Sequence, residues 1–121
     1  KNFDAKIKKN ILKIFNKFKP NIVIHLAAVS HDSKSNIDPE SAFENSFRTL
    51  FNSLEAAKKT KDIHFIYLSS SMVYGNFIKK VAHEKDSCNP IGIYGSLKLS
   101  GENLLKSYSN GKNYGIITMT G

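Results

Sequence analysis

The feature that most limits the possible folds is an apolar run without polar alternation, Asn21-Ile-Val-Ile-His-Leu-Ala-Ala28. Such a run is typical of a parallel strand buried on both faces, and it predicts a strand at residues 21–27. Further apolar runs and helically spaced apolar stripes predict five more elements: strands at 63–69 and 114–119, and helices at 4–18, 39–59 and 93–109. Because helices and strands alternate, we expect an α/β fold with a parallel sheet, right-handed crossovers and flanking helices.

Size and composition favour one ordinary globular domain. The chain has 121 residues, of which 40% are hydrophobic and 23% charged, close to the average for globular proteins. No apolar run approaches the ~20 residues of a membrane span, and residues 1–9 lack the pattern of a signal peptide. The single cysteine, Cys88, excludes an intramolecular disulfide. A reducing cytoplasm is therefore the expected location.

The charge balance raises the question of a polyanionic partner. Eighteen basic and ten acidic residues give a net charge of +8, but Arg48 is the only arginine and the lysines are scattered between apolar helix positions. This pattern favours a solvated lysine surface, with no nucleic-acid or membrane partner, over a polyanion site, which stays the alternative. A substrate that carries a diphosphate would also suit a basic protein.

Small and hydroxylated residues follow each predicted strand, at 27–30, 69–71 and 118–120. Ligands of open parallel sheets bind beyond the carboxyl ends of the strands. Small side chains let a flat cofactor approach the backbone, and hydroxyls can bind its polar groups. Residues 72–92 form a long segment without periodicity, and such a segment in a compact domain is usually functional or disordered. The sequence therefore predicts a ligand site at this end of the sheet.

The third predicted helix begins with Tyr94-Gly-Ser-Leu-Lys98. Spacing of i and i+4 places the phenol and the ammonium on one helix face. A phenol is a poor base at neutral pH, but a neighbouring positive charge favours its deprotonated form. Such a pair could take a proton from a hydroxyl whose carbon loses hydride to a nicotinamide cofactor. The alternative is a surface aromatic beside a solvated lysine.

Three blocks in the same order resemble the extended short-chain dehydrogenase/reductase superfamily, in its NAD-dependent epimerase/dehydratase family. They are His25-Leu-Ala-Ala28, Ser69-Ser-Ser-Met-Val-Tyr-Gly75 and Pro90-Ile-Gly-Ile-Tyr-Gly-Ser-Leu-Lys98. The resemblance implies a Rossmann-type three-layer sandwich that binds NAD, with NADP left open. It also implies a nucleotide-diphosphate sugar as substrate and a homodimer for the complete enzyme.

The resemblance assigns roles to individual residues. Tyr94 matches the catalytic acid/base, Lys98 its activator, and Ser70 the hydroxyl that bonds the reacting group. The implied cofactor contacts are Ala27, Ala28, Ser69, Tyr94 and Lys98. No metal is implied, and the histidines lack the spacing of metal ligands. His25 is interpreted as a hydrogen-bonded residue near a strand end.

One departure from the family pattern limits what the chain contains. The seven glycines include no Gly-x-Gly-x-x-Gly, the turn that places a pyrophosphate on a helix N-terminus. Residues 1–121 are therefore interpreted as an incomplete Rossmann domain, without the Gly-rich unit before it and the substrate domain after it. Asn45 lies where the family has an asparagine, but Arg48 replaces the usual glycine and the helix is one residue out of step. The alternative to a catalytic enzyme is a non-catalytic nucleotide-binding module or an inactive relic of such an enzyme.

The two residues after Ser70 bear on which reaction the complete enzyme catalyses. Typical 4,6-dehydratases of the family have an Asp-Glu pair where this chain has Ser71 and Met72. A thioether cannot exchange protons, so dehydration by that route is disfavoured. Oxidation and reduction at the sugar C4, as in an epimerase or a ketoreductase, needs only Ser70, Tyr94 and Lys98.

Overall fold

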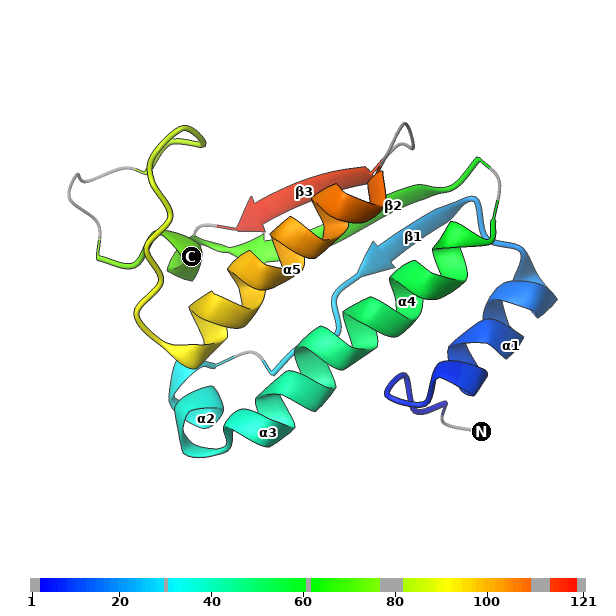
Figure 1. Ribbon diagram of the computed structural model, residues 1–121, viewed down its shortest axis with the longest axis horizontal. Coiled ribbons are helices and arrows are strands. Elements are labelled where there is room, and N and C mark those ends of the chain that lie inside the picture. The colour runs from blue at the N-terminus through cyan, green and yellow to red at the C-terminus, as the bar shows by residue number, and fades with distance from the viewer. Residues whose placement is uncertain (1–2, 30, 61, 77–81, 110–113, 120–121) are drawn as a thin grey trace.

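A computed structural model of the chain describes residues 3–29, 31–60, 62–76, 82–109 and 114–119. Its sheet has three strands: β1 (Ile22–His25), β2 (His64–Ser70) and β3 (Tyr114–Met119). Their order is β1-β2-β3 and both pairings are parallel, with Ile24 opposite Ile66 and Tyr67 opposite Ile116. The predicted parallel strands are confirmed in that order, and all their carboxyl ends lie at one edge of the sheet (Figure 1).

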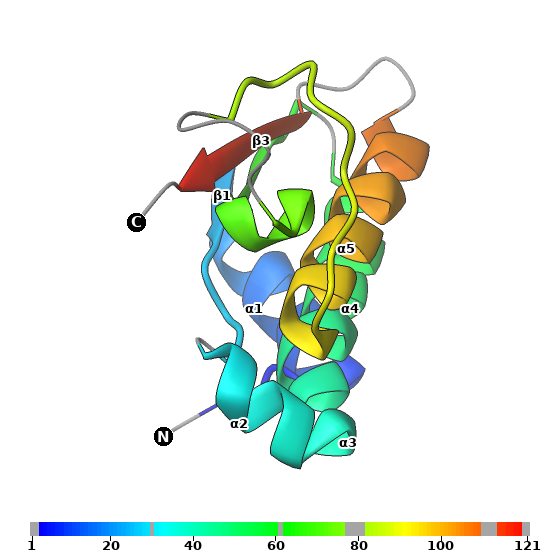
Figure 2. The ribbon, with the colours of Figure 1, turned by 90° about the vertical axis from the view of Figure 1, so that its left-hand side faces the viewer.

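Three long helical segments, α1 (Lys8–Phe18), α4 (Thr49–Lys58) and α5 (Ile93–Ser109), lie on the same side of the sheet (Figure 2). The core between them is formed by Leu50, Leu54, Ala57, Ile63, Phe65, Tyr67 and Leu105. On β1, Ile22 and Ile24 face the other side and are more than half exposed. The described elements thus supply the sheet and one helical layer of the expected sandwich. None of the described helices combines the length and the apolarity that crossing a membrane requires.

The predicted helix over 39–59 is confirmed, but its winding changes along its length. It begins with α3 (Pro39–Ala42), whose start is capped by Asp38 Oδ1 accepting from Ser41 N at 3.0 Å, as expected for an Asp-Pro start. A π-helical segment, η1 (Phe43–Arg48), joins it to α4. A π turn holds one extra residue.

The first helix begins later than predicted. Residues 4–7 were expected to be helical but lie outside α1. The carbonyls of Ala5 and Lys6 instead accept hydrogen bonds from Asn52 Nδ2, at 3.0 and 2.9 Å. Asn52 is buried on α4, so this turn is fixed by a residue far along the chain. The first strand is also shorter than predicted and ends at His25.

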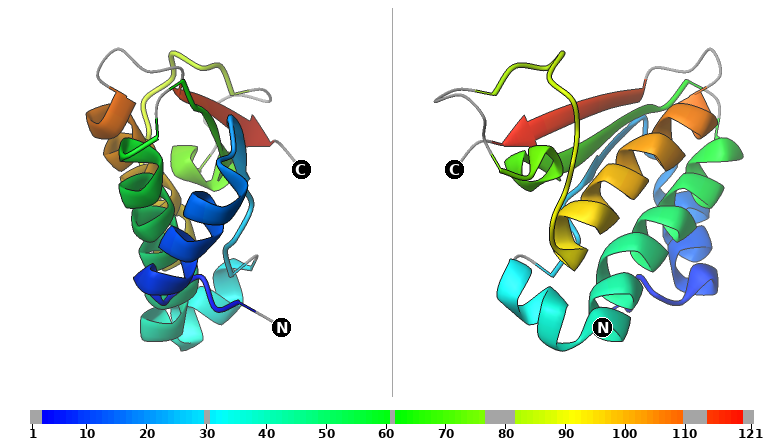
Figure 3. Two further views of the ribbon diagram at one scale, coloured as in Figure 1. Left: turned by 90° about the vertical axis from the view of Figure 1, so that its right-hand side faces the viewer. Right: turned by 60° about the vertical axis from the view of Figure 1, so that its left-hand side comes forward.

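Two short elements were not predicted. The helix α2 (Asp32–Ile37) follows the loop after β1, and a 3₁₀ turn, η2 (Ser71–Tyr74), follows β2 directly. Gly75 ends that turn with a φ of +70°, in the region that glycine adopts readily. Figure 3 shows α2 beside the first turn of α5, at the strand-end side of the molecule.

Candidate active site

Lys98, the charged residue of the predicted site, is buried. Its side chain projects from α5 onto the end of β2, where Nζ donates to the carbonyl oxygen of Leu68 at 2.6 Å. The residue is only 4% exposed, and Nζ lies 5.0 Å from the centroid of the Tyr67 ring. Burial lowers the pKa of Lys98 to about 8. This ammonium therefore releases its proton far more readily than a surface lysine.

Tyr94 lies next to Lys98, one helical turn earlier on α5. Lys98 Nζ is 5.8 Å from the centroid of the Tyr94 ring, and Tyr94 is half-buried. The arrangement expected from the i, i+4 spacing is therefore present. Tyr67, below the pair, has its pKa raised first by burial and then by the charges of Glu102 and Tyr94. Its hydroxyl stays protonated and is unsuited to act as a base.

The first turn of α5 is pressed against the turn that follows β2. A methyl group at Gly95 would lie 2.5 Å from the carbonyl oxygen of Met72, so only glycine permits this approach. Tyr94 precedes Gly95, and Ser70 lies two residues before Met72. The close contact therefore brings the backbone around Ser70 and the first turn of α5 together.

Ser69 and Ser70 have different environments although they are adjacent. The Ser69 hydroxyl is buried and donates to Glu102 Oε1 at 2.5 Å. Ser70 lies on the opposite side of the strand, because successive side chains alternate, and its Oγ accepts from Met72 N at 3.3 Å. The Ser69 hydroxyl is thus occupied inside the protein, whereas that of Ser70 is half-buried.

Glu102 was missed by the sequence analysis. It is 8% exposed and lies four residues after Lys98, so it extends the face of α5 that carries Tyr94 and Lys98. Its spacing from Lys98 was the available signal. Its partner Ser69 is 33 residues away, and a carboxylate at such a position looks solvated until the fold is known.

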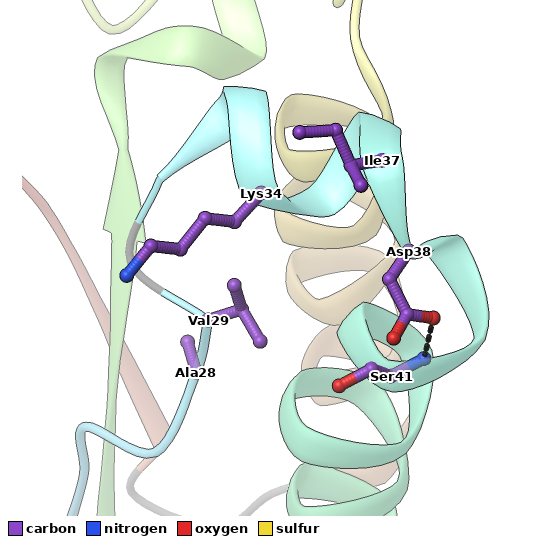
Figure 4. A pocket seen from close by; sticks show the side chains of 6 residues that line it. All are labelled: Ala28, Val29, Lys34, Ile37, Asp38 and Ser41. Atoms are coloured by element: carbon purple, nitrogen blue, oxygen red, sulfur yellow. Dashed lines mark hydrogen bonds between the residues drawn. The ribbon is translucent and has the colours of Figure 1, made fainter.

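A pocket of about 490 Å³ lies beyond the end of β1 (Figure 4). It is lined by Ala28, Val29, Lys34, Ile37, Asp38 and Ser41. Ala28 is a predicted cofactor contact, while the remaining lining residues were not predicted. Its neighbour Ala27 is exposed. The pocket thus includes one predicted contact and does not include Ser70, Tyr94 or Lys98.

His25 is buried at the end of β1. Its ring lies about 6 Å from the rings of Phe65 and Tyr67. Burial, followed by the charge of Lys98, lowers its pKa to about 4, against the opposing effect of a hydrogen bond with the Ala27 backbone. Nε2 has no partner among the described residues. The expected hydrogen bonding is therefore present at one ring nitrogen and not at the other. His25 is thus held neutral.

The residues at the strand ends fit a nicotinamide nucleotide. Lys98 has three N–H donors, and Leu68 O accepts from one of them, so the ammonium can also donate to a ribose hydroxyl. In the loop after β1, Ala27 is exposed and Ala28 is half-buried, and side chains this small would let a flat ring approach the backbone. Ser30, at the same predicted strand end as Ala27 and Ala28, and Thr120, at that of the third strand, lie outside the described residues.

Comparison with known proteins identifies the class. The NAD dependent epimerase/dehydratase family matches residues 2–120, so the chain belongs to this family. A dTDP-D-glucose 4,6-dehydratase of Dictyostelium discoideum is 36% identical, over 78% of this chain and 24% of its own length.

Solved structures share the fold. UDP-glucose 4-epimerase from Brucella ovis, solved in complex with NAD, has a TM-score of 0.89 and 28% identity, covering 95% of this chain and 36% of that one. L-threonine dehydrogenase from Clostridium difficile also has a TM-score of 0.89, with 27% identity, covering 100% of this chain and 38% of that one. The chain therefore spans well under half the length of each relative. The shared fold does not by itself select a sugar substrate.

Proposed function

We propose that this chain is the central part of an NAD-dependent nucleotide-sugar epimerase-type oxidoreductase acting at the sugar C4. The observation that carries the proposal is the placement of Lys98, buried between the end of β2 and the Tyr94 ring, 2.6 Å from Leu68 O and 5.8 Å from the ring centroid. The ammonium and the phenol therefore lie side by side at the strand ends, the arrangement that proton transfer by a positioned pair requires.

The chain's own residues would divide the work as follows. Tyr94 Oη takes the proton of the C4 hydroxyl, and Ser70 hydrogen-bonds the same oxygen. Lys98 stabilises the phenolate and donates to the nicotinamide ribose. When bound, the nicotinamide supplies the acceptor and donor of hydride. Tyr94 returns the proton to the C4 oxygen when the carbon is reduced on its opposite face, which inverts C4.

The complete enzyme is proposed to be a homodimer, with residues 1–121 forming part of its Rossmann domain. Ala27, Ala28 and Ser69 are proposed as cofactor contacts in addition to Tyr94 and Lys98. For Ser69 the backbone is the available contact, because its hydroxyl is bonded to Glu102. Ala28 would contact the cofactor from the wall of the pocket.

Dehydration is the second candidate, since the Dictyostelium relative is described as a 4,6-dehydratase. Met72 is 38% exposed beside the site, and neither it nor Ser71 is an acid or a base at neutral pH. A dehydratase would need other residues for the additional proton transfers. An assay of nucleotide-diphosphate hexoses for C4 inversion and for loss of water distinguishes the two reactions.

The decisive experiment is Tyr94→Phe in the complete enzyme. Turnover is expected to fall by about 10²-fold or more, the contribution of a positioned acid/base, while cofactor binding persists. Tyr108→Phe on the same helix is the matched control. Tyr108 donates to Glu55 at 2.6 Å, away from the strand ends, so its loss should leave turnover unchanged. Full activity in Tyr94→Phe would favour the non-catalytic alternative for this site.

A second comparison tests the serine assignment. Ser70→Ala should lower turnover, whereas Ser71→Ala should have a much smaller effect, because only Ser70 occupies the family's hydroxyl position. Equal losses in the two variants would show that the assignment of Ser70 is wrong.

A further inference from the structure

The first turn of α5 is capped by a residue from a distant part of the chain. The first N–H groups of any helix lack intrahelical acceptors, and Gly92, just before α5, has no side chain to cap them. Asn36 on α2 does so instead: its Oδ1 accepts from Ile93 N at 3.0 Å. The two residues are 57 positions apart, so this cap exists only in the folded protein.

Asp32, one turn earlier on α2, supports Asn36. Asn36 Nδ2 donates to Asp32 Oδ2 at 3.0 Å, which fixes the orientation of the amide. The other oxygen, Oδ1, is buried without a hydrogen-bond partner among the described residues. A methyl group at Gly92 would lie 2.1 Å from this Oδ1, so the carboxylate lies directly against the start of α5. A negative charge there is favoured by the helix dipole.

Tyr94 immediately follows Ile93, so its position depends on whether this first turn is ordered. Terminal turns of helices open more easily than their interiors. We propose that Asp32 and Asn36 are positioning residues, which act on the reaction by holding the Tyr94 turn of α5 in place. This inference rests on the proposed function, because it assigns them an effect on turnover through Tyr94.

The test uses Asn36→Ala in the complete enzyme. Alanine is the better helix former, so any loss cannot arise from weaker propensity in α2. Amide hydrogen exchange of a peptide spanning residues 91–97 should become faster. Turnover should fall, by up to about 10²-fold where the displacement of the catalytic group reaches about 1 Å. Asn103→Ala, an exposed position on α5, is the matched control and should change neither.

A charge exchange tests whether the pair acts as a unit. Asn36→Asp keeps an acceptor for Ile93 N but places two carboxylates together and should resemble Asn36→Ala. The double variant Asp32→Asn/Asn36→Asp restores one amide, one carboxylate and the same net charge. It should recover exchange protection and most of the turnover. Failure of the double variant to recover either quantity would contradict the inference.

A double-mutant cycle separates positioning from general stability. If Asn36 acts through Tyr94, Asn36→Ala should have little further effect on residual turnover in a Tyr94→Phe background. Additive losses would overturn the positioning role. Full activity of Tyr94→Phe alone would instead overturn the proposed function. In that case exchange still decides the structural part: unaltered protection of residues 91–97 in Asn36→Ala would show that the pair does not hold this turn.

Discussion

Acid should destabilise the protein through His25, and the structure gives the magnitude. Burial, reinforced by Lys98, lowers the pKa of the ring from 6.5 to about 4. In the unfolded chain His25 binds a proton below about pH 6.5, while the folded protein resists it until about pH 4. Because each factor of ten in proton affinity is worth about 1.4 kcal/mol, the folded state should lose about 3 kcal/mol between these values. This contribution is fully present above about pH 6.5 and disappears as the pH falls.

The variant His25→Phe isolates this effect, because it replaces the buried ring by one of similar shape that cannot bind a proton. The free energy of unfolding is measured by urea denaturation between about pH 7 and about pH 4. As the pH falls, the variant should gain on the wild type by up to about 3 kcal/mol. His64→Phe, at an exposed position on β2, is the control and should follow the wild type. Parallel curves for His25→Phe and the wild type would refute the reasoning.

Three further outcomes are expected. The lowered pKa of Lys98, about 8, means that unfolding should become less favourable as the pH rises above about 8 toward the ordinary lysine pKa of about 10.4. In urea denaturation, Lys98→Met should flatten the rise of the free energy of unfolding with pH. An unchanged slope of that free energy against pH would contradict the prediction. Gly95→Ala should lower the melting temperature despite the better helix propensity of alanine, because its methyl group meets Met72 O at 2.5 Å. Ser100→Ala on the same helix should not lower the melting temperature. A higher melting temperature of Gly95→Ala would show that the backbone around Met72 moves easily to admit the methyl group. The purified 121-residue chain should self-associate in sedimentation, because β1 pairs with β2 alone among the described strands and an unpaired strand edge invites association. Ile24→Lys should reduce the self-association, and a monomeric wild type would disprove the prediction.

Much of the fold could be predicted because long elements carry their own pattern. The helix at 93–109 was predicted with its observed bounds, Ile93–Ser109, because its apolar stripe faces one continuous core. The helix α2 could not be predicted, since its sequence Asp-Ser-Lys-Ser-Asn-Ile has no apolar stripe. Its stability comes from tertiary contacts such as that of Asn36 with Ile93.

The candidate site could be predicted in part for the same reason. Tyr94 and Lys98 are one helical turn apart, so their proximity follows from sequence spacing alone. The pairing of Ser69 with Glu102 and the cap from Asn36 join residues 33 and 57 positions apart. Short polar residues at such separations carry no pattern, and only the folded chain shows which of them meet.

The π turn of η1 restricts which changes of sequence this region can accept during evolution. Each residue turns an α-helix by about 100°, so the extra residue between Phe43 and Arg48 sets the rotational phase of everything after it. Before the turn, Ser41 lines the pocket; after it, Leu50 and Leu54 fill the core. Deleting one residue here would leave a good α-helix whose two halves could no longer face both neighbours. Substitutions within the segment should therefore be tolerated far better than any change in its length.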